Sequence, residues 1–365
     1  MSQPTDRSSA EQNGSDAMTG GRNRNGFPSS RFPEGWFPVS WSHELAAGEV
    51  KRLHYFDSEL VLWRGANGEA YVQDAFCLHL GAHRGVGGWV VGDDLACPWH
   101  GWEWDGDGHN TRIPYSGEGC KPKLKIRTYP VREWCGTIVI WYSEDSDKQP
   151  SWEPPLVPEY GRKDFFDMHP FSSKVHRTKT HVQMPIENAV DPAHIAYIHG
   201  AGEIPKQVSF HSEGPWFQSN VSVVYGAGKK STAFTPNGPV EALVEMNTYG
   251  IGLSLIRWVD PVPTIQVTGF IPVDNEYIDY YFAQCSQQPE GADPTKPEGP
   301  GVRFVQVQQK VIEQDFPIWA NMTYLQRPHF AAEEAKAYSA MRRWAAQFYP
   351  AEDHDRMIAM AGGPE

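Results

Sequence analysis

Short apolar runs separated by turn residues dominate the first part of the chain, from Trp36 to Tyr142. Period-two alternation of polar and apolar residues predicts half-buried strands, and a continuous apolar run predicts a fully buried one. Asn67-Gly68 is a turn signal between two such runs. The strands we expect are Leu60–Arg64, Ala70–Phe76, Trp89–Val91, Leu95–Ala96, Lys123–Arg127 and Thr137–Tyr142. This part of the chain is therefore predicted to consist mainly of strands.

A change of composition after Tyr142 indicates a domain boundary. Charged residues at 144–148 are followed by Pro150 and by Pro154-Pro155, which is typical of a linker. We predict a disordered tail at residues 1–30, a first domain at 31–150 and a second domain at 151–365. In the second domain we expect a helical segment around 183–200, strands between about 206 and 287, and helices at 302–320 and 330–349.

Composition restricts the class of protein. A chain of 365 residues can form two domains with separate cores. Its net charge of −13 argues against nucleic acid or an anionic membrane as a partner. The first thirty residues lack the apolar stretch of a signal peptide, and no apolar run has the length of a membrane span. We therefore expect a soluble, cytoplasmic protein without a membrane segment.

Two cysteine–histidine pairs carry the most specific chemical signal. Cys77 precedes His79 by two residues, and Cys97 precedes His100 by three. A Rieske [2Fe-2S] cluster binds two thiolates at one iron and two imidazoles at the other, so each of two short loops must offer one ligand of each kind. These four residues are predicted to bind such a cluster. Structural zinc is the alternative, but zinc fingers favour a two-cysteine knuckle followed by a histidine pair, which this chain lacks.

The surroundings of these pairs refine the prediction. Gly81 and Gly101 follow the two histidines closely, where a chain that folds over a cluster needs a residue without a side-chain clash. Ala82, Trp99 and Trp102 stand where respiratory Rieske proteins carry two bridged cysteines and a serine that donates to a cluster sulfur. Because fewer hydrogen bonds stabilise the reduced state less, we expect a reduction potential of about −150 mV, at the low end of the Rieske range.

A second constellation contains His194 and His199, in a stretch that also carries Asn188 and Asp191. Two histidines and one carboxylate form the facial triad that binds mononuclear Fe(II) and leaves positions open for O₂. A separation of five residues corresponds to about 140° around an ideal α-helix, so the two rings converge only if the helix is widened or broken. Pro192 makes such a distortion credible. Two histidines of a packed core are the alternative interpretation.

For the third ligand we favour Asp315. A helical projection places it on the same side as Ile312 and Trp319, so its carboxylate would face inward, where an anion needs partners. The alternative is an aspartate that caps a helix beginning at Pro317. Candidates for lining a substrate pocket, with core packing as the competing role, are Trp216, Phe217, Tyr225 and Trp258.

Together these motifs resemble the oxygenase component of Rieske non-haem iron oxygenases. Within that group the chain is most similar to 3-ketosteroid 9α-hydroxylases and, more distantly, to cholesterol 7-desaturases. The resemblance runs from Gly35 to about Tyr349, and its most specific pieces are Cys97–Trp102, Asn188–His199, Gln314–Trp319, Arg342–Tyr349 and Ser151–Glu153. It implies an α+β fold in which an all-β Rieske domain precedes a helix-grip catalytic domain, where a curved antiparallel sheet wraps a helix.

The same resemblance implies a function and an assembly. The chain would be the terminal oxygenase of a multicomponent monooxygenase that hydroxylates a steroid with O₂ and with electrons from NADH, delivered by a ferredoxin or flavin reductase. Asp191 would bridge His194 to a cluster histidine of the neighbouring subunit in a homotrimer, and Asn188 would lie near the iron. Animal cholesterol desaturases carry an N-terminal membrane segment, so this chain resembles the soluble bacterial type.

Other functions stay open at this point. One scaffold of this kind serves many substrates, so the substrate could be another apolar ring or an N- or O-methyl compound, or the reaction could be desaturation of a sterol. The chain could also be a Rieske electron carrier, or a lipid-binding module whose iron site is vestigial.

Overall fold

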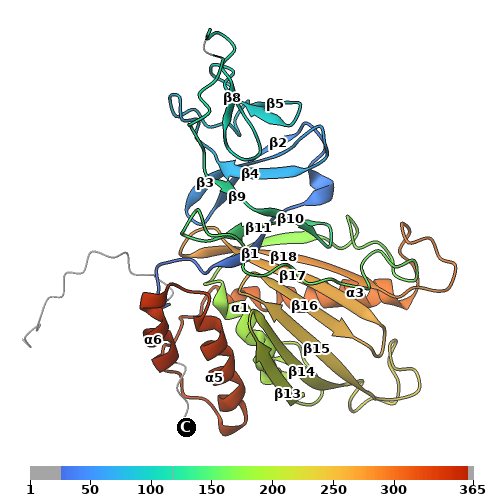
Figure 1. Cartoon of the computed structure of the whole chain (residues 1–365). Helices are drawn as coiled ribbons and strands as arrows, with labels where there is room; N and C mark the ends of the chain where they lie inside the picture. Colours follow the sequence, from blue (N-terminus) through green and yellow to red (C-terminus); the bar gives the residue numbers. More distant parts are fainter. Residues whose placement is uncertain (1–25, 118, 361–365) are drawn as a thin grey trace, which may run out of the picture.

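The computed structural model describes residues 26–117 and 119–360, arranged as an N-terminal part of small sheets and a C-terminal part built on one large sheet (Figure 1). Strands and helices both contribute, and helices cover the large sheet, so the predicted α+β class is confirmed. The tail predicted at residues 1–30 lies mostly outside the described residues. Among the described residues, no helix combines the length and the apolar character needed to cross a membrane.

Antiparallel pairing builds the N-terminal part (residues 35–142) from short strands joined by tight turns. The first sheet has the order β1 (Gly35–Trp41), β11 (Thr137–Tyr142), β10 (Val131–Trp134). The second has the order β2 (Val50–Tyr55), β3 (Ser58–Arg64), β4 (Ala70–Asp74), β9 (Thr128–Tyr129). The third has the order β5 (Trp89–Val91), β6 (Asp94–Ala96), β7 (Glu103–Trp104), β8 (Asn110–Arg112). The 3-10 turn η1 (Ser42–Glu44) follows β1.

One strand prediction in this part is wrong. The alternating segment Lys123–Arg127 forms no ladder, only an isolated bridge between Lys125 and His109. Leu124 and Ile126 do point into the core beside the predicted cluster loops, as the alternation requires. The segment lies beside residues 108–110, where the Ile126 N–H bonds to the Gly108 carbonyl at 2.9 Å. However, the Leu124 N–H bonds locally to the Lys121 carbonyl, so the pairing does not extend beyond one bridge.

The C-terminal part is organised around a sheet of antiparallel strands. Its order is β12 (Lys174–Lys179), β18 (Tyr277–Ser286), β17 (Thr264–Pro272), β16 (Leu253–Trp258), β15 (Val240–Tyr249), β14 (Trp216–Tyr225), β13 (Lys206–Glu213). β17 is buried along its whole length. One of its faces packs on the N-terminal part, where a Cβ at Gly269 would lie only 2.5 Å from Pro38. The other face of this sheet is turned toward the helices and, together with α3 (Pro300–Glu313), lines a cavity.

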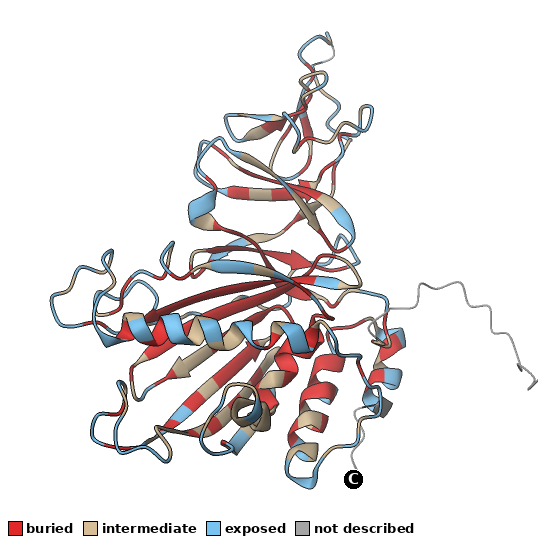
Figure 2. Ribbon diagram, turned by 180° about the vertical axis from the view of Figure 1, so that it is seen from behind, coloured by how far each residue is buried: buried red, intermediate tan, exposed pale blue. Residues whose placement is uncertain are grey.

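Helices occupy that other face and the edge of the sheet (Figures 1 and 2). In chain order they are α1 (Gln183–Glu187), η2 (Asn188–Val190), α2 (Pro192–Tyr197), α3 (Pro300–Glu313), α4 (Phe316–Trp319), α5 (Ala332–Ala346) and α6 (Ala351–Met360). Figure 2 shows α3 crossing the sheet with its buried side turned toward it. The helix predicted at 302–320 is thus two helices, with Gln314 and Asp315 at the break.

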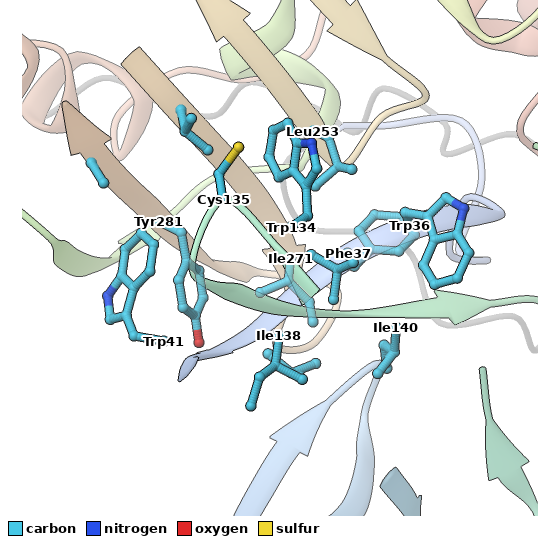
Figure 3. Packing of buried hydrophobic residues seen from close by; sticks show 14 of the residues in the cluster. Trp36, Phe37, Trp41, Trp134, Cys135, Ile138, Ile140, Leu253, Ile271 and Tyr281 are labelled. Carbon is cyan, nitrogen blue, oxygen red and sulfur yellow. The ribbon is translucent and has the colours of Figure 1, made fainter. Parts of the chain in front are cut away.

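A shared apolar core joins the two parts (Figure 3). Trp36, Phe37 and Ile138 from the N-terminal part pack in one cluster with Leu253 and Ile271 from the large sheet. Because this cluster crosses the predicted boundary, the division near residue 150 stays a prediction.

Candidate functional site

The segment that carries the two histidines is broken into short helical pieces. Asp191 separates η2 from α2 and has a non-helical backbone, with φ −114° and ψ 79°. Proline disfavours a helical conformation in the preceding residue and is well tolerated at the first position of a helix, so Pro192 ends one piece and begins the next. α2 ends at Tyr197, before His199. The distortion that the histidine spacing requires is therefore a helix that stops between the two rings, and not a widened turn.

This break brings His194, His199 and Asp315 together. One ligand atom from each residue lies within 4.8 Å of the others. His199 Nε2 is 3.4 Å from Asp315 Oδ1, and the two imidazole rings are 5.1 Å apart at an angle of 80°. Two imidazoles and one carboxylate that converge in this way fit the facial triad of a non-haem Fe(II) site.

The far side of each imidazole ring is held by a hydrogen bond. Nδ1 of His194 contacts the main-chain oxygen of Asp191, and Nδ1 of His199 lies 3.0 Å from Oε1 of Gln314. Both acceptors are oxygens without a proton to give, so Nδ1 is the donor in each ring and Nε2 is the nitrogen that remains for a metal ion. Such partners orient metal-binding histidines. Sequence reasoning missed Gln314, although it directly precedes Asp315.

Asp315 does not cap the helix that follows it. It occupies the position before α4, but its side chain makes no capping hydrogen bond. Instead, Asn188 Nδ2 donates to Asp315 Oδ2 at 3.3 Å, and Oδ1 faces His199. Burial would lower the pKa of His199, but the hydrogen bond and the charge of Asp315 outweigh it and raise that pKa. Asn188 therefore reaches the same centre by holding its carboxylate.

Asp191 caps α2 and is itself held from the C-terminal helix α5. Its Oδ1 accepts from the His194 main-chain N–H at 3.2 Å, and the Tyr338 hydroxyl donates to the same carboxylate. Burial would raise the pKa of Asp191, but the hydrogen bonds from His194 and Tyr338 prevail and lower it. Asp191 is thus an ionised carboxylate fixed beside a candidate iron ligand. Sequence reasoning did not identify Tyr338 as the partner of Asp191.

The two cysteine–histidine loops meet at the end of the N-terminal part that is remote from α1 (Figure 1). Cys77 donates a hydrogen bond to the sulfur of Cys97; this bond, with the main-chain N–H groups of Trp99 and His100, lowers the pKa of Cys97. The rings of His79 and His100 lie 4.7 Å apart. Paired sulfurs opposite paired imidazoles are the donor set of a Rieske cluster.

Tight turns close both loops. The N–H of Gly81 bonds to the Cys77 carbonyl, and the N–H of Gly101 bonds to the Cys97 carbonyl, each at 2.9 Å. Both glycines have positive φ, 74° and 68°, which is the backbone conformation that glycine adopts without strain. The predicted reason, a side-chain clash, applies only to Gly101, where a Cβ would lie 3.1 Å from Pro114 Cγ; at Gly81 a Cβ would meet nothing within 4 Å, so the positive φ is what requires glycine there.

A cavity of about 510 Å³ adjoins the three candidate iron ligands. Most of its lining is apolar and comes from the large sheet and α3, including Val223, Met246, Ile256, Phe270, Phe304 and Val311. Among the polar side chains, Gln266 is almost fully buried, and its Oε1 accepts from Gln284 Nε2 at 2.7 Å. This bond turns the Gln266 amide N–H groups away from Gln284.

Two of the four pocket candidates line this cavity. Tyr225 and Trp258 do so. Trp216 does not, because its indole N–H bonds to Asn247 Oδ1 at 3.0 Å. Phe217 is fully buried and packs 5.4 Å from the ring of Trp344, in the core. Alternation along β14 places Trp216 on the face opposite to Phe217 and Tyr225. Phe217 shares the face of Tyr225 but lies eight residues away along the strand, beside Trp344 of α5.

Comparison with known proteins agrees with both candidate centres. A family model described as the Rieske [2Fe-2S] domain matches residues 35–130. Solved structures with the same fold include dicamba monooxygenase bound to dicamba (TM-score 0.66, 17% identity, 90% of this chain and 98% of that one). Another is NdmA of Pseudomonas putida CBB5 with caffeine (TM-score 0.67, 16% identity, 89% and 94%). The chain is thus a Rieske-type oxygenase, an oxidoreductase with a [2Fe-2S] domain. A further structure of dicamba monooxygenase with the same fold is described with a non-heme iron, a metal that the donor set of His194, His199 and Asp315 also fits.

A second family model, described as the 3-ketosteroid 9alpha-hydroxylase C-terminal domain, matches residues 140–349, and the chain belongs to this family. Similar curated proteins include a probable 3-ketosteroid-9-alpha-monooxygenase oxygenase component of Rhodococcus rhodochrous, 29% identical over 89% of this chain and 82% of that protein. A cholesterol 7-desaturase of Hemicentrotus pulcherrimus is 28% identical over 87% of this chain and 70% of that protein.

Proposed function

We propose that the protein is the terminal oxygenase of a multicomponent monooxygenase that hydroxylates a 3-ketosteroid-like steroid. The electrons come from NADH through a separate ferredoxin or flavin reductase. The observation that carries this proposal is the largely apolar cavity of about 510 Å³ directly against His194, His199 and Asp315. This volume lies in the range of pockets that enclose a drug-sized molecule.

The side chains of this chain divide the work between two centres. Cys77, His79, Cys97 and His100 would hold the cluster, and the triad of His194, His199 and Asp315 would hold the iron. When bound, the cluster supplies single electrons and the iron activates dioxygen. The apolar walls exclude water and position one C–H bond of a rigid substrate near the triad, and such positioning alone can contribute a large part of a rate enhancement.

Asp191 is assigned the link between the centres. It is ionised and partly exposed, and it is fixed by Tyr338 and by the N-terminus of α2. We expect Asp191→Ala to keep the cluster and its absorbance but to slow turnover strongly, whereas Asp315→Ala should lose the mononuclear iron. Full activity in Asp315→Ala would remove this residue from the iron site.

The proposed assembly is a homotrimer in which the cluster of one subunit approaches the iron of its neighbour. Apolar side chains around the cluster loops are unusually open to solvent, since Leu78, Leu80, Trp99 and Tyr115 are each more than half exposed. Exposed apolar surface of this kind supports an interface. Sedimentation analysis should give three times the chain mass, and a monomer at working concentration would contradict the assembly.

Reconstitution tests the proposed substrate. The purified oxygenase, a compatible reductase and NADH should convert a 3-ketosteroid into a hydroxylated product that contains one atom from ¹⁸O₂. Relatives named cholesterol 7-desaturase make a desaturated sterol the second candidate product, and the same mass analysis distinguishes it because it contains no added oxygen. NADH consumption without oxidation of any steroid offered would refute the steroid assignment.

A further inference from the structure

Arg84 is a fully buried cation directly behind the first cluster loop. Its main-chain N–H bonds to the Ala75 carbonyl at 2.9 Å, which closes the loop that carries Cys77 and His79. The side chain turns back under this loop and has no exposed surface. Nη1 donates to Gln73 Oε1 at 2.7 Å and Nη2 donates to the Asp74 carbonyl at 2.6 Å. Both acceptors are neutral, so they orient the guanidinium without balancing its charge.

No carboxylate within the described residues lies at ion-pair distance from this guanidinium. Asp74 is the acidic neighbour, but its carboxylate accepts from the Tyr129 hydroxyl at 2.9 Å. Nε of Arg84 also has no hydrogen-bond partner in that part of the chain. A buried charge without a counter-ion is costly. The positive charge of Arg84 therefore needs a negatively charged partner that is not a carboxylate.

Among the groups of opposite charge near the guanidinium, the two cluster cysteines act on it more strongly than Asp74 does. Arg84 lies over the ring of Trp104 at 5.9 Å, and Trp104 packs in one small core with Cys77 and Cys97. Burial lowers the pKa of Arg84 to about 10, and the thiolate charges of Cys77 and Cys97 are the main influences that oppose this shift. At neutral pH the guanidinium is therefore charged.

We propose that Arg84 is an electrostatic tuning residue that raises the reduction potential of the cluster. With two ferric ions, two sulfides, two thiolates and two neutral imidazoles, the oxidised cluster has no net charge, and one added electron gives it a charge of −1. A fixed positive charge in a buried site stabilises the reduced state selectively. Arg84 thus acts in the direction opposite to the missing serine donor, whose absence lowers the potential. The inference rests on cluster binding in this part of the chain and not on the steroid substrate.

The test is a redox titration of the purified holoenzyme and three variants. Arg84→Gln removes the charge but keeps an amide that can donate to Gln73 and Asp74, and Arg84→Lys keeps the charge. Arg112→Gln is the matched control, because Arg112 is an exposed arginine of the same part, paired with Glu103 at 2.7 Å. We expect Arg84→Gln to shift the reduction equilibrium about tenfold toward the oxidised form, which is 59 mV for one electron. Arg84→Lys and Arg112→Gln should titrate close to the wild type.

Cluster content, read from the visible spectrum and from acid-labile sulfide, is scored in the same samples. Loss of the cluster in Arg84→Gln with full loading in Arg84→Lys supports the proposal. In that case the positive charge is required to stabilise the thiolates of Cys77 and Cys97 when they bind the cluster. An unchanged potential in Arg84→Gln would overturn it. So would equal shifts in the Gln and Lys variants, or loss of the cluster in both, since shape and not charge would then be decisive.

Discussion

Replacing Arg342 by methionine is expected to destabilise the C-terminal part by about 3–4 kcal/mol at pH 7. Arg342 reaches from α5 to α1, where Nε and Nη2 donate to the two carboxylate oxygens of Glu187 at 3.1 and 2.9 Å. Both side chains are buried. Glu187 directly precedes Asn188, so this ion pair also anchors the segment that leads to the candidate iron ligands.

The magnitude follows from what the variant leaves behind. Without Arg342, Glu187 keeps hydrogen bonds from Gln183 Nε2, at 3.0 Å, and from the Tyr324 hydroxyl, but it becomes a buried charge without a counter-ion. Such a carboxylate takes up a proton instead. For a glutamic acid of ordinary acidity this costs about 3.7 kcal/mol at pH 7, but only about 1.6 kcal/mol at pH 5.5. The destabilisation caused by Arg342→Met should therefore shrink by about 2 kcal/mol between these pH values.

Differential scanning calorimetry at both pH values measures this effect. For a domain of this size, the predicted loss lowers the melting temperature by roughly 10 °C at pH 7. The double variant Arg342→Met/Glu187→Met should recover most of the loss, because two apolar side chains can replace a buried ion pair. The reasoning is refuted if Arg342→Met melts within about 2 °C of the wild type, or if its deficit is the same at pH 5.5 as at pH 7.

Four further predictions follow from the same structure. Gln314→Leu should weaken iron binding about 10- to 100-fold, because the ring of His199 loses its orienting acceptor, whereas Gln314→Glu should retain affinity; iron titration monitors both. His181 is buried, and burial lowers its pKa to about 3. The free energy of unfolding is therefore highest above pH 6.5 and decreases as the pH falls toward 3. The free energy of unfolding should fall by about 2 kcal/mol from pH 8 to pH 5, and His181→Phe should abolish this pH-dependent decrease in denaturant titrations. Gln266→Met should weaken binding of a ketosteroid about tenfold but spare its analogue without the ketone, as measured by calorimetry; equal weakening of both would indicate a packing effect. The wild-type cluster should titrate near about −150 mV, and a value above about +100 mV would contradict the argument from sulfur hydrogen bonds.

Local motifs made the candidate ligands predictable. Cys77 and His79 share one short loop, and Cys97 and His100 share another, so their spacing alone specified a cluster. Asp315 is remote in sequence from His194, but the helical projection gave its inward direction, and the structure places it beside His199. On a continuous helix, His194 and His199 would point in different directions. A local break removes this difficulty, because Pro192 begins a helix that ends before His199.

Contacts between distant residues were not predictable. Gln314, Tyr338 and Arg84 act on ligands through side chains whose partners depend on how separate elements pack, and no periodicity encodes that. The segment Lys123–Arg127 shows the opposite failure, since its alternation correctly gave the buried side but not the hydrogen-bond partners of its backbone. The hydrophobic pattern of a segment indicates which of its sides is buried, whereas the residues that pack against that side depend on the tertiary structure.

Iron content per chain tests the central claim most directly, namely that one chain holds a [2Fe-2S] cluster at Cys77, His79, Cys97 and His100 and one iron at His194, His199 and Asp315. Metal analysis of the reconstituted wild type should give about three iron atoms and two acid-labile sulfides per chain, and Asp315→Ala should retain about two irons with the sulfide unchanged. A wild type with only two irons, or an Asp315→Ala variant that still binds three, would contradict it.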